Sequence, residues 1–212
     1  GDREKSYWPG DDREVLVTDL HSLSENEMPS VAKNGFALLR HNSQMTEYED
    51  EEQVERIYYP EMIELAKQVN GAQKAIAFGH VARTDAPDAR QHQQPSHAAH
   101  VDYGRKTIEE YAYNILGDEA EKYLQKRVVL MNFWRPIKTV YRSPLALVDA
   151  ATVEKDDLNF AEVRGGLNDP ERPPLYGWNL SYNPKHHWYF ASEMKPEEIF
   201  AFKLYDSKEE AP

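Results

Sequence analysis

His100 and Asp102 are the two residues whose types and spacing could bind a metal ion. On an extended strand, side chains two residues apart leave the same face, so this imidazole and this carboxylate would lie side by side. They are two of the three ligand types of a 2-His-1-carboxylate facial triad, which holds a ferrous ion and leaves positions open for a co-substrate and oxygen. A His-x-Asp pair also occurs by chance, so the metal hypothesis needs support from the rest of the chain.

The composition excludes several other classes of function. The chain has 212 residues, enough for one domain with a hydrophobic core, and 40% of them are hydrophobic. Its formal net charge of −12 argues against nucleic acid and against an anionic membrane surface as partners. The absence of cysteine excludes disulfides, thiolate nucleophiles and Cys-ligated zinc. No apolar run is long enough to cross a membrane, and the charged start is unlike a signal peptide, so we expect a cytosolic protein.

The hydrophobic pattern predicts helices early in the chain and short strands later. We expect helices over 47–71, 107–116 and 118–126, the second opened by a capping box at Thr107, and strands over 14–20, 35–41, 74–78, 127–135, 145–148, 176–182, 188–191 and 199–204. Residues 84–98 are polar and aperiodic, and they form either an active-site loop or an ordinary surface loop. The fold class is therefore α+β, with a second half shaped like a jelly roll.

Six short segments, in this order along nearly the whole chain, resemble one family of enzymes. They are Tyr58–Glu61 (YYPE), His100–Tyr103 (HVDY), Asn132–Pro136 (NFWRP), Pro144–Asp149 (PLALVD), Tyr182–Pro184 leading into His187–Tyr189, and Lys203–Ser207 (KLYDS). The chain resembles the fungal and bacterial hydroxylase/desaturase group of iron(II)/2-oxoglutarate-dependent oxygenases, which is related to cephem methoxylases and gibberellin desaturases. No serine-hydrolase elbow, phosphate-binding loop, dinucleotide fingerprint or H-E-x-x-H motif supports a rival chemistry.

The resemblance implies a double-stranded β-helix, a cupin-like jelly roll with the metal at its open mouth. It implies a single oxygenase domain over 1–212, with a helical and strand part over about 1–98 and the jelly-roll core over about 99–212. The implied cofactors are Fe(II), 2-oxoglutarate and O2, with His100 and Asp102 as the catalytic iron ligands. The implied reaction hydroxylates, desaturates or cyclises a small molecule through C–H abstraction, in secondary metabolism. The family's third ligand, a histidine, and its 2-oxoglutarate-binding arginine follow the Lys203–Ser207 segment, so we expect both beyond Pro212, with the C-terminal part of the family fold.

Other residues are candidates for the remaining roles. His187 is an alternative third ligand, whereas the adjacent His186 would face the other way on a strand and pack or bind near the pocket. Asn132, Arg135 and Tyr103 are candidates for binding the co-substrate. Along the strand, Asn132 and Arg135 lie on opposite faces, and an inward arginine would suit a carboxylate. The alternative for this arginine is a surface salt bridge.

Three aromatic residues are candidates for contacting the substrate, namely Trp134, Trp188 and Tyr189. The alternative is that they simply form the core, as strand aromatics commonly do. Two rival functions also stay open at this point. One is a non-catalytic jelly-roll binding module, and the other is a cupin-like metalloenzyme that does not use 2-oxoglutarate. If the protein forms oligomers, a homodimer is the expected state.

Overall fold

The computed structural model describes residues 10–86, 94–163 and 175–209, and their elements interleave short helices with strands. The helices are α1 (Val31–Asn34), α2 (Glu51–Gln53), α3 (Tyr59–Asn70), α4 (Arg105–Leu116) and α5 (Ala120–Leu124). The strands are β1 (Val17–Asp19), β2 (Phe36–Arg40), β3 (His100–Val101), β4 (Val129–Trp134), β5 (Leu147–Val148), β6 (Leu158–Val163), β7 (Leu175–Leu180), β8 (Trp188–Phe190) and β9 (Glu198–Asp206). The α+β class is confirmed.

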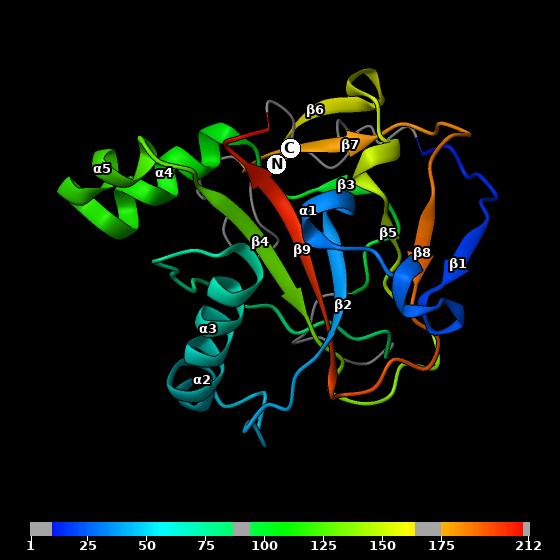
Figure 1. Cartoon of the computed structure of the whole chain (residues 1–212), viewed down its shortest axis with the longest axis horizontal. Coiled ribbons are helices and arrows are strands. Elements are labelled where there is room, and N and C mark those ends of the chain that lie inside the picture. The colour runs from blue at the N-terminus through cyan, green and yellow to red at the C-terminus, as the bar shows by residue number, and fades with distance from the viewer. Residues whose placement is uncertain (1–9, 87–93, 164–174, 210–212) are drawn as a thin grey trace.

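The strands in the described residues pair into three three-stranded sheets, with orders β2-β9-β4, β1-β8-β5 and β3-β7-β6. Figure 1 shows β9 at the centre, with β2 and β4 beside it and the β3-β7-β6 sheet across one end. All pairings are antiparallel except that of β1 with β8. A register shift between Leu130 and Met131 breaks the ladder of β4 with β9 near one end of the pair.

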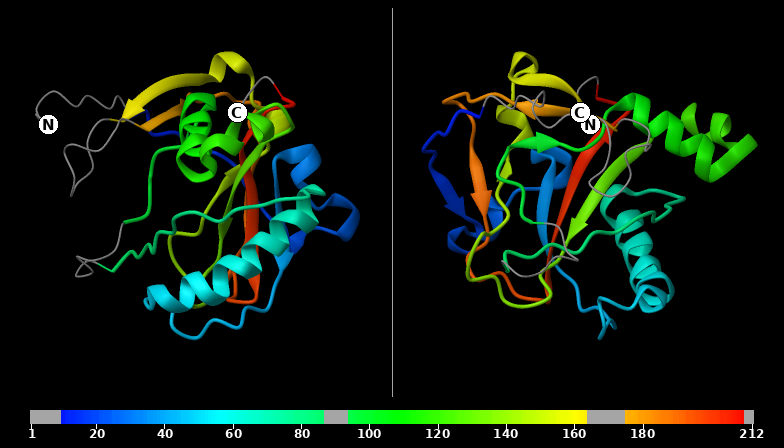
Figure 2. Two further views of the ribbon diagram at one scale, coloured as in Figure 1. Left: turned by 90° about the vertical axis from the view of Figure 1, so that its left-hand side faces the viewer. Right: turned by 180° about the vertical axis from the view of Figure 1, so that it is seen from behind.

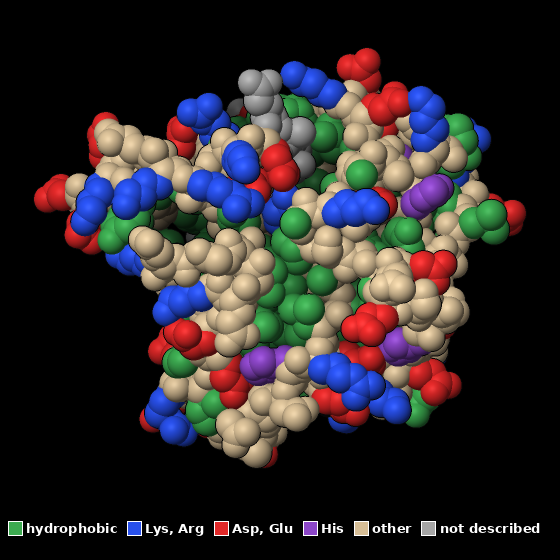
Figure 3. Space-filling view, viewed as in Figure 1, with side chains coloured by type: hydrophobic (Ala, Val, Ile, Leu, Met, Phe, Trp, Pro, Cys, Tyr) green, Lys and Arg blue, Asp and Glu red, His purple; other side chains and the backbone are tan. Residues whose placement is uncertain are grey.

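The central sheet is buried on both faces because its side chains alternate. Phe36 and Phe200 point to the side of the β1-β8-β5 sheet, where they pack with Leu20, Met194 and Tyr189. On the opposite face, Ile199 packs against Met62 and Leu65 of α3, which runs along the sheet in Figure 2. Figure 3 shows hydrophobic side chains gathered along the middle of the face that carries β9, with charged side chains around them.

The predicted helix over 47–71 forms, but it contains a segment of different geometry. Asp50 caps its start by accepting hydrogen bonds from the amides of Glu52 and Gln53, and Gly71 ends it with a left-handed φ of 65°. Residues Val54–Tyr58 adopt a π-helical turn, in which the amide of Tyr59 bonds to the carbonyl of Val54. Pro60 lies in the first turn of α3, a position that tolerates proline because the amide there needs no partner within the helix.

Two predictions about elements are wrong, and one strand was not predicted. Residues 72–82 contain no strand, because side-chain contacts hold them: Phe78 packs on Tyr111 at 5.2 Å, and Lys74 lies over Tyr123. Strand β6 was missed because Asn, Glu and a largely exposed Phe160 interrupt its apolar pattern. Helix α4 begins at Arg105 without a capping box, since the hydroxyl of Thr107 donates to the carbonyl of Tyr176. Part of the polar segment 84–98, residues 87–93, lies outside the described residues.

Candidate metal site

Strand β3 sets the position of His100 through its pairing with β7, where His100 lies opposite Asn179 and Val101 opposite Trp178. The chain bends at Asp102, directly after the strand. His100 Nδ1 donates to the carbonyl of Ala98 at 2.7 Å, which fixes the ring and leaves Nε2 pointing at Asp102. Metal-binding histidines commonly use their second nitrogen in this way, because the hydrogen bond orients the ring and fixes the tautomer.

The carboxylate of Asp102 lies between two elements. Its Oδ1 is 3.1 Å from His100 Nε2, and its Oδ2 accepts a long hydrogen bond of 3.4 Å from Asn132 Nδ2 on β4. The contact with Asp102 raises the pKa of His100, partly offset by burial. The contact with His100 lowers the pKa of Asp102, again against the effect of burial. The positive charge of Arg83 also lowers both pKa values.

The geometry of the pair fits a metal ion bound by both groups. Two ligand atoms at about 2.1 Å from a metal, at a right angle to each other, are about 3 Å apart. The separation of 3.1 Å between Nε2 and Oδ1 matches this value. The side chains of His100 and Asp102 are 33% and 40% exposed, so an ion and its other ligands can reach them. An imidazole and a carboxylate are also the donor types that suit ferrous iron.

A third ligand for this pair does not come from the residues that the structure describes. Within them, no group of three or more His, Asp or Glu side chains could hold a metal ion. His187 therefore does not join His100 and Asp102. It lies in the loop before β8, exposed to solvent, and its backbone amide bonds to the hydroxyl of Thr152. The prediction of His187 as a ligand is wrong, because it assumed a strand position that the chain does not reach until Trp188.

Several known proteins are similar to this chain in sequence and in structure. A family described as "Oxidoreductase/YMDC permease-like domain" matches residues 2–212. The alpha-ketoglutarate-dependent dioxygenase phiK of Fungal sp. (strain ATCC 74256) is 31% identical over 88% of this chain and 71% of its own length. The hydroxylase/desaturase efuI of Hormonema carpetanum is 30% identical over 92% and 72%. The chain belongs to the hydroxylase/desaturase family of iron(II)/2-oxoglutarate-dependent dioxygenases.

The fold is similar to that of a solved member of this family. The iron and alpha-ketoglutarate-dependent endoperoxidase NvfI superposes with a TM-score of 0.74 and 26% identity, over 84% of this chain. The chain spans 65% of that structure, and slightly more than two thirds of the two relatives. The names of these relatives give iron and 2-oxoglutarate, and dioxygenases of this family use them together with O2. Within the described residues, no helix combines the length and the apolar character needed to span a membrane.

The guanidinium of Arg135 is bonded on the side of β4 opposite to Asn132, and its role in binding the co-substrate stays a prediction. Arg135 follows Phe133 on the face of β4 that packs toward α3, opposite to the face of Asn132. Its guanidinium donates to the carbonyls of His41 and Pro196 and lies over the ring of Tyr58 at 5.8 Å. The sequence identified the two faces of this strand correctly, but it could not say which face would lie toward the site.

The aromatic candidates and Tyr103 all pack against other rings. Tyr103 meets Tyr111 of α4 edge-on at 5.8 Å. Trp134 and Tyr189 pack on the core cluster of Phe36 and Phe200, which supports the alternative that they are core residues. Trp188 lies 6.3 Å from the ring of His186. The role of Trp134, Trp188 and Tyr189 toward a substrate stays a prediction, as does the role of Tyr103 in binding the co-substrate.

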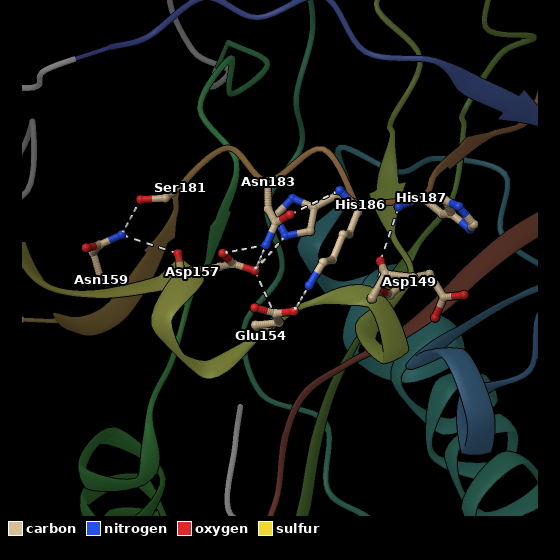
Figure 4. A network of polar contacts seen from close by, with 10 residues as sticks. Asp149, Glu154, Asp157, Asn159, Ser181, Asn183, His186 and His187 are labelled. Atoms are coloured by element: carbon tan, nitrogen blue, oxygen red, sulfur yellow. Dashed lines mark hydrogen bonds and ion pairs between the residues drawn. The ribbon is translucent and has the colours of Figure 1, made fainter.

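A second histidine and aspartate form a separate, buried network, drawn in Figure 4. His186, expected to pack or to bind near the pocket, has a side chain only 2% exposed, and its Nε2 lies 3.0 Å from Asp157 Oδ2. Asp157 also accepts hydrogen bonds from the amide of Glu154 at 2.8 Å and from the side chain of Asn183. These partners lower the pKa of Asp157, the Glu154 amide most strongly. The network ties the start of β6 to the turn before β8.

Two residues of β7 complete the surroundings of the metal pair and were missed from the sequence. Asn179 pairs directly with His100 and shares its face of the sheet, and Gly177 lies two residues earlier on that face. The polar Gly-x-Asn spacing within a predicted strand was a visible signal. It could not be used because the pairing of β7 with β3 joins residues about 80 positions apart, which no local pattern reveals.

Proposed function

We propose that this chain forms the iron-binding part of an oxygenase that oxidises a C–H bond of a small molecule in secondary metabolism. The observation that carries the proposal is the contact between His100 Nε2 and Asp102 Oδ1, with its spacing of 3.1 Å and partial exposure. The names of the relatives and of the structural neighbour include dioxygenase, hydroxylase/desaturase and endoperoxidase. These reactions diverge after hydrogen has been removed from the substrate, so the choice among hydroxylation, desaturation and cyclisation depends on the position of the substrate.

Each residue of the site has a distinct task in this proposal. His100 and Asp102 hold the iron, and the Ala98 carbonyl keeps the Nε2 lone pair of His100 directed at it. Asn132 orients the carboxylate of Asp102. When bound, iron(II) with 2-oxoglutarate and dioxygen supplies the oxidation that removes hydrogen from the substrate. The third ligand comes from outside the described residues, since no third His, Asp or Glu among them joins the pair.

The architecture around the site is proposed to be a jelly roll. Three antiparallel or mixed sheets, with the metal pair at the end of the core where β3 and β4 meet, support this arrangement. We keep the division into a helical and strand part over about 1–98 and a jelly-roll core over about 99–212. A cytosolic location and a homodimeric state also stay predictions.

The test is an anaerobic titration of the full-length protein with Fe(II) and then with 2-oxoglutarate. We expect a visible metal-to-ligand charge-transfer band after the second addition, and we expect His100→Ala to lack it. His187→Ala is the matched control and should keep the band, because His187 lies away from the pair. Iron uptake without the band would favour a cupin-like metalloenzyme that does not use 2-oxoglutarate. A protein that binds no metal would be a non-catalytic binding module.

A further inference from the structure

Gly177 lies on β7 at the crossing with the chain that leaves β3, next to the pairing of Val101 with Trp178. A Cβ atom at this position would lie 2.4 Å from the carbonyl oxygen of Val101, and 3.1 and 3.2 Å from the carbonyl oxygen and carbon of Asp102. Real Cβ atoms are not found at 2.4 Å from an oxygen, because their van der Waals radii would overlap. Gly177 does not have a positive φ angle. The glycine is therefore needed because a side chain would not fit, and not because the backbone is left-handed.

The atoms that would collide with a side chain at Gly177 belong to the backbone of β3 and of Asp102, the residue directly after it. A flexible side chain could rotate away, but the carbonyls of Val101 and Asp102 can move only if β3 moves with them. The strand is held on both sides of this point. His100 pairs with Asn179 before it, and the amide of Gly104 donates to the carbonyl of Tyr176 at 2.9 Å after it.

We propose that Gly177 is a positioning residue for the metal ligand Asp102. By carrying no side chain, it lets β3 lie against β7 at the depth that brings the Asp102 carboxylate to His100 Nε2 and Asn132 Nδ2. The inference rests on the proposed function, since it concerns the same metal pair. It adds to that function a statement about the backbone. Gly177 sets the distance between β3 and β7, and this distance determines whether His100 and Asp102 are correctly spaced.

The first experiment compares cobalt(II) affinity, followed by the visible spectrum of bound Co(II), in the full-length wild type, Gly177→Ala and Gly104→Ala. A methyl group at Gly104 would be 3.4 Å from Trp178 Nε1 and 3.9 Å from the Tyr176 carbonyl, which are ordinary contacts. Gly104 is the N-cap of α4, where alanine is the poorer residue, so this control also loses some stability. We expect Gly177→Ala to bind Co(II) at least about 10-fold more weakly, and Gly104→Ala to keep the wild-type affinity.

The comparison separates positioning from a general loss of stability. Melting temperatures of both variants are measured beside their affinities, and a purely structural role would lower the melting temperature without changing the affinity of the folded protein. Equal Co(II) affinities for wild type and Gly177→Ala would overturn the role of Gly177 while leaving the proposed function intact. A wild type that binds no Co(II) would instead overturn the proposed function, and the positioning role with it.

A second measurement needs no variant and applies even if Gly177→Ala does not fold. If the crossing of β3 and β7 positions Asp102, then a bound metal must stabilise the crossing in return. We expect Co(II) to slow hydrogen exchange at the amide of Gly104, which bonds across the crossing to Tyr176. The amide of Lys203, which bonds to the carbonyl of Gly35 in the central sheet, serves as the reference. Exchange at Gly104 that Co(II) does not slow relative to Lys203 would overturn the proposal.

Discussion

Two histidine–aspartate pairs in this protein have nearly the same geometry but very different surroundings. His100 and Asp102 are separated by 3.1 Å between nitrogen and oxygen, and His186 and Asp157 by 3.0 Å. The side chains of the first pair are 33% and 40% exposed, whereas those of the second are 2% and 11% exposed. The N–O distance alone therefore does not distinguish a metal site from a structural contact.

The partners of the carboxylate make the difference. Asp157 is surrounded by donors, because it accepts from the Glu154 amide, from both contacts of Asn183 and from His186. Three of these contacts fall on Oδ2 and one on Oδ1, and the side chain is 11% exposed, so donors and packing surround this carboxylate where an ion would have to bind. Asp102 contacts His100 Nε2, accepts a hydrogen bond of 3.4 Å from Asn132, and is 40% exposed. We infer that the network around Asp157 stabilises the fold, whereas the carboxylate of Asp102 is kept accessible for a metal.

The largest expected effect is on metal affinity, from Asp102→Ala. Removing one ligand should weaken Fe(II) or Co(II) binding by more than about 100-fold, which exceeds the effect of changing residues around the ligands. The melting temperature of the metal-free protein should change by less than about 2 °C, because exposed ion pairs contribute little to stability. Metal titration and thermal unfolding of the same samples measure both quantities. An affinity within a few-fold of the wild type would remove Asp102 from the site.

The equivalent substitution in the buried pair is Asp157→Ala. We expect it to lower the melting temperature by roughly 5 °C, since it leaves the buried His186 and the Asn183 amide without their acceptor. Metal affinity of the folded protein should stay within about 3-fold of the wild type, a change too small to mark a ligand. Because the pKa of Asp157 is lowered in the folded state, its contribution to stability should fade as the pH falls through that pKa. A variant that melts like the wild type would show that the network does not stabilise the fold.

A smaller effect is expected from removing the side-chain amide that contacts each carboxylate, Asn132 for Asp102 and Asn183 for Asp157. Asn132→Ala should weaken metal binding by about 10-fold, because the carboxylate of Asp102 loses its orienting donor on β4. Its matched control is Asn183→Ala, which removes the corresponding amide from Asp157. This control should lower the melting temperature without changing metal affinity. Equal metal affinities in the two variants would mean that Asn132 plays no part in positioning Asp102.

The sequence predicted the local part of the site and failed on the parts that depend on distant contacts. His100 and Asp102 are two residues apart, so one assumption about the backbone was enough to place them side by side. The surroundings of Arg135 depend on α3 covering its face of β4, which is a tertiary contact that the local sequence does not show. His187 failed for a similar reason, since the turn before β8 sends the neighbouring His186 into the Asp157 network.

The same distinction holds for the fold. The long helix and the strands around residues 36–40 and 129–134 carry strong periodic signals, and they form as predicted. The segment 74–78 has the composition of a strand, but in the described structure it finds no strand partner and is held by rings. Strand β6 has a weak pattern and forms because β7 pairs with it along its whole length. Pairing partners, not local propensity, decide these two cases.

A third carboxylate, Asp206, sharpens the comparison because it is buried like Asp157 but paired with a cation. Arg127, 79 residues away, bonds to both of its oxygens and, as the main cause, lowers its pKa from 3.8 to about 2. Since the folded-state pKa lies below the unfolded one, the stabilisation is fully present above about pH 4 and is lost as the pH falls through about 2. We expect on the order of 1 kcal/mol, because Arg127 is 46% exposed and water screens the pair. Urea unfolding of wild type and Asp206→Asn at pH 6 and pH 2.5 measures it, with Glu209→Gln as the exposed control. A difference between wild type and Asp206→Asn that is the same at both pH values would show that Arg127 does not hold Asp206 ionised in the folded protein.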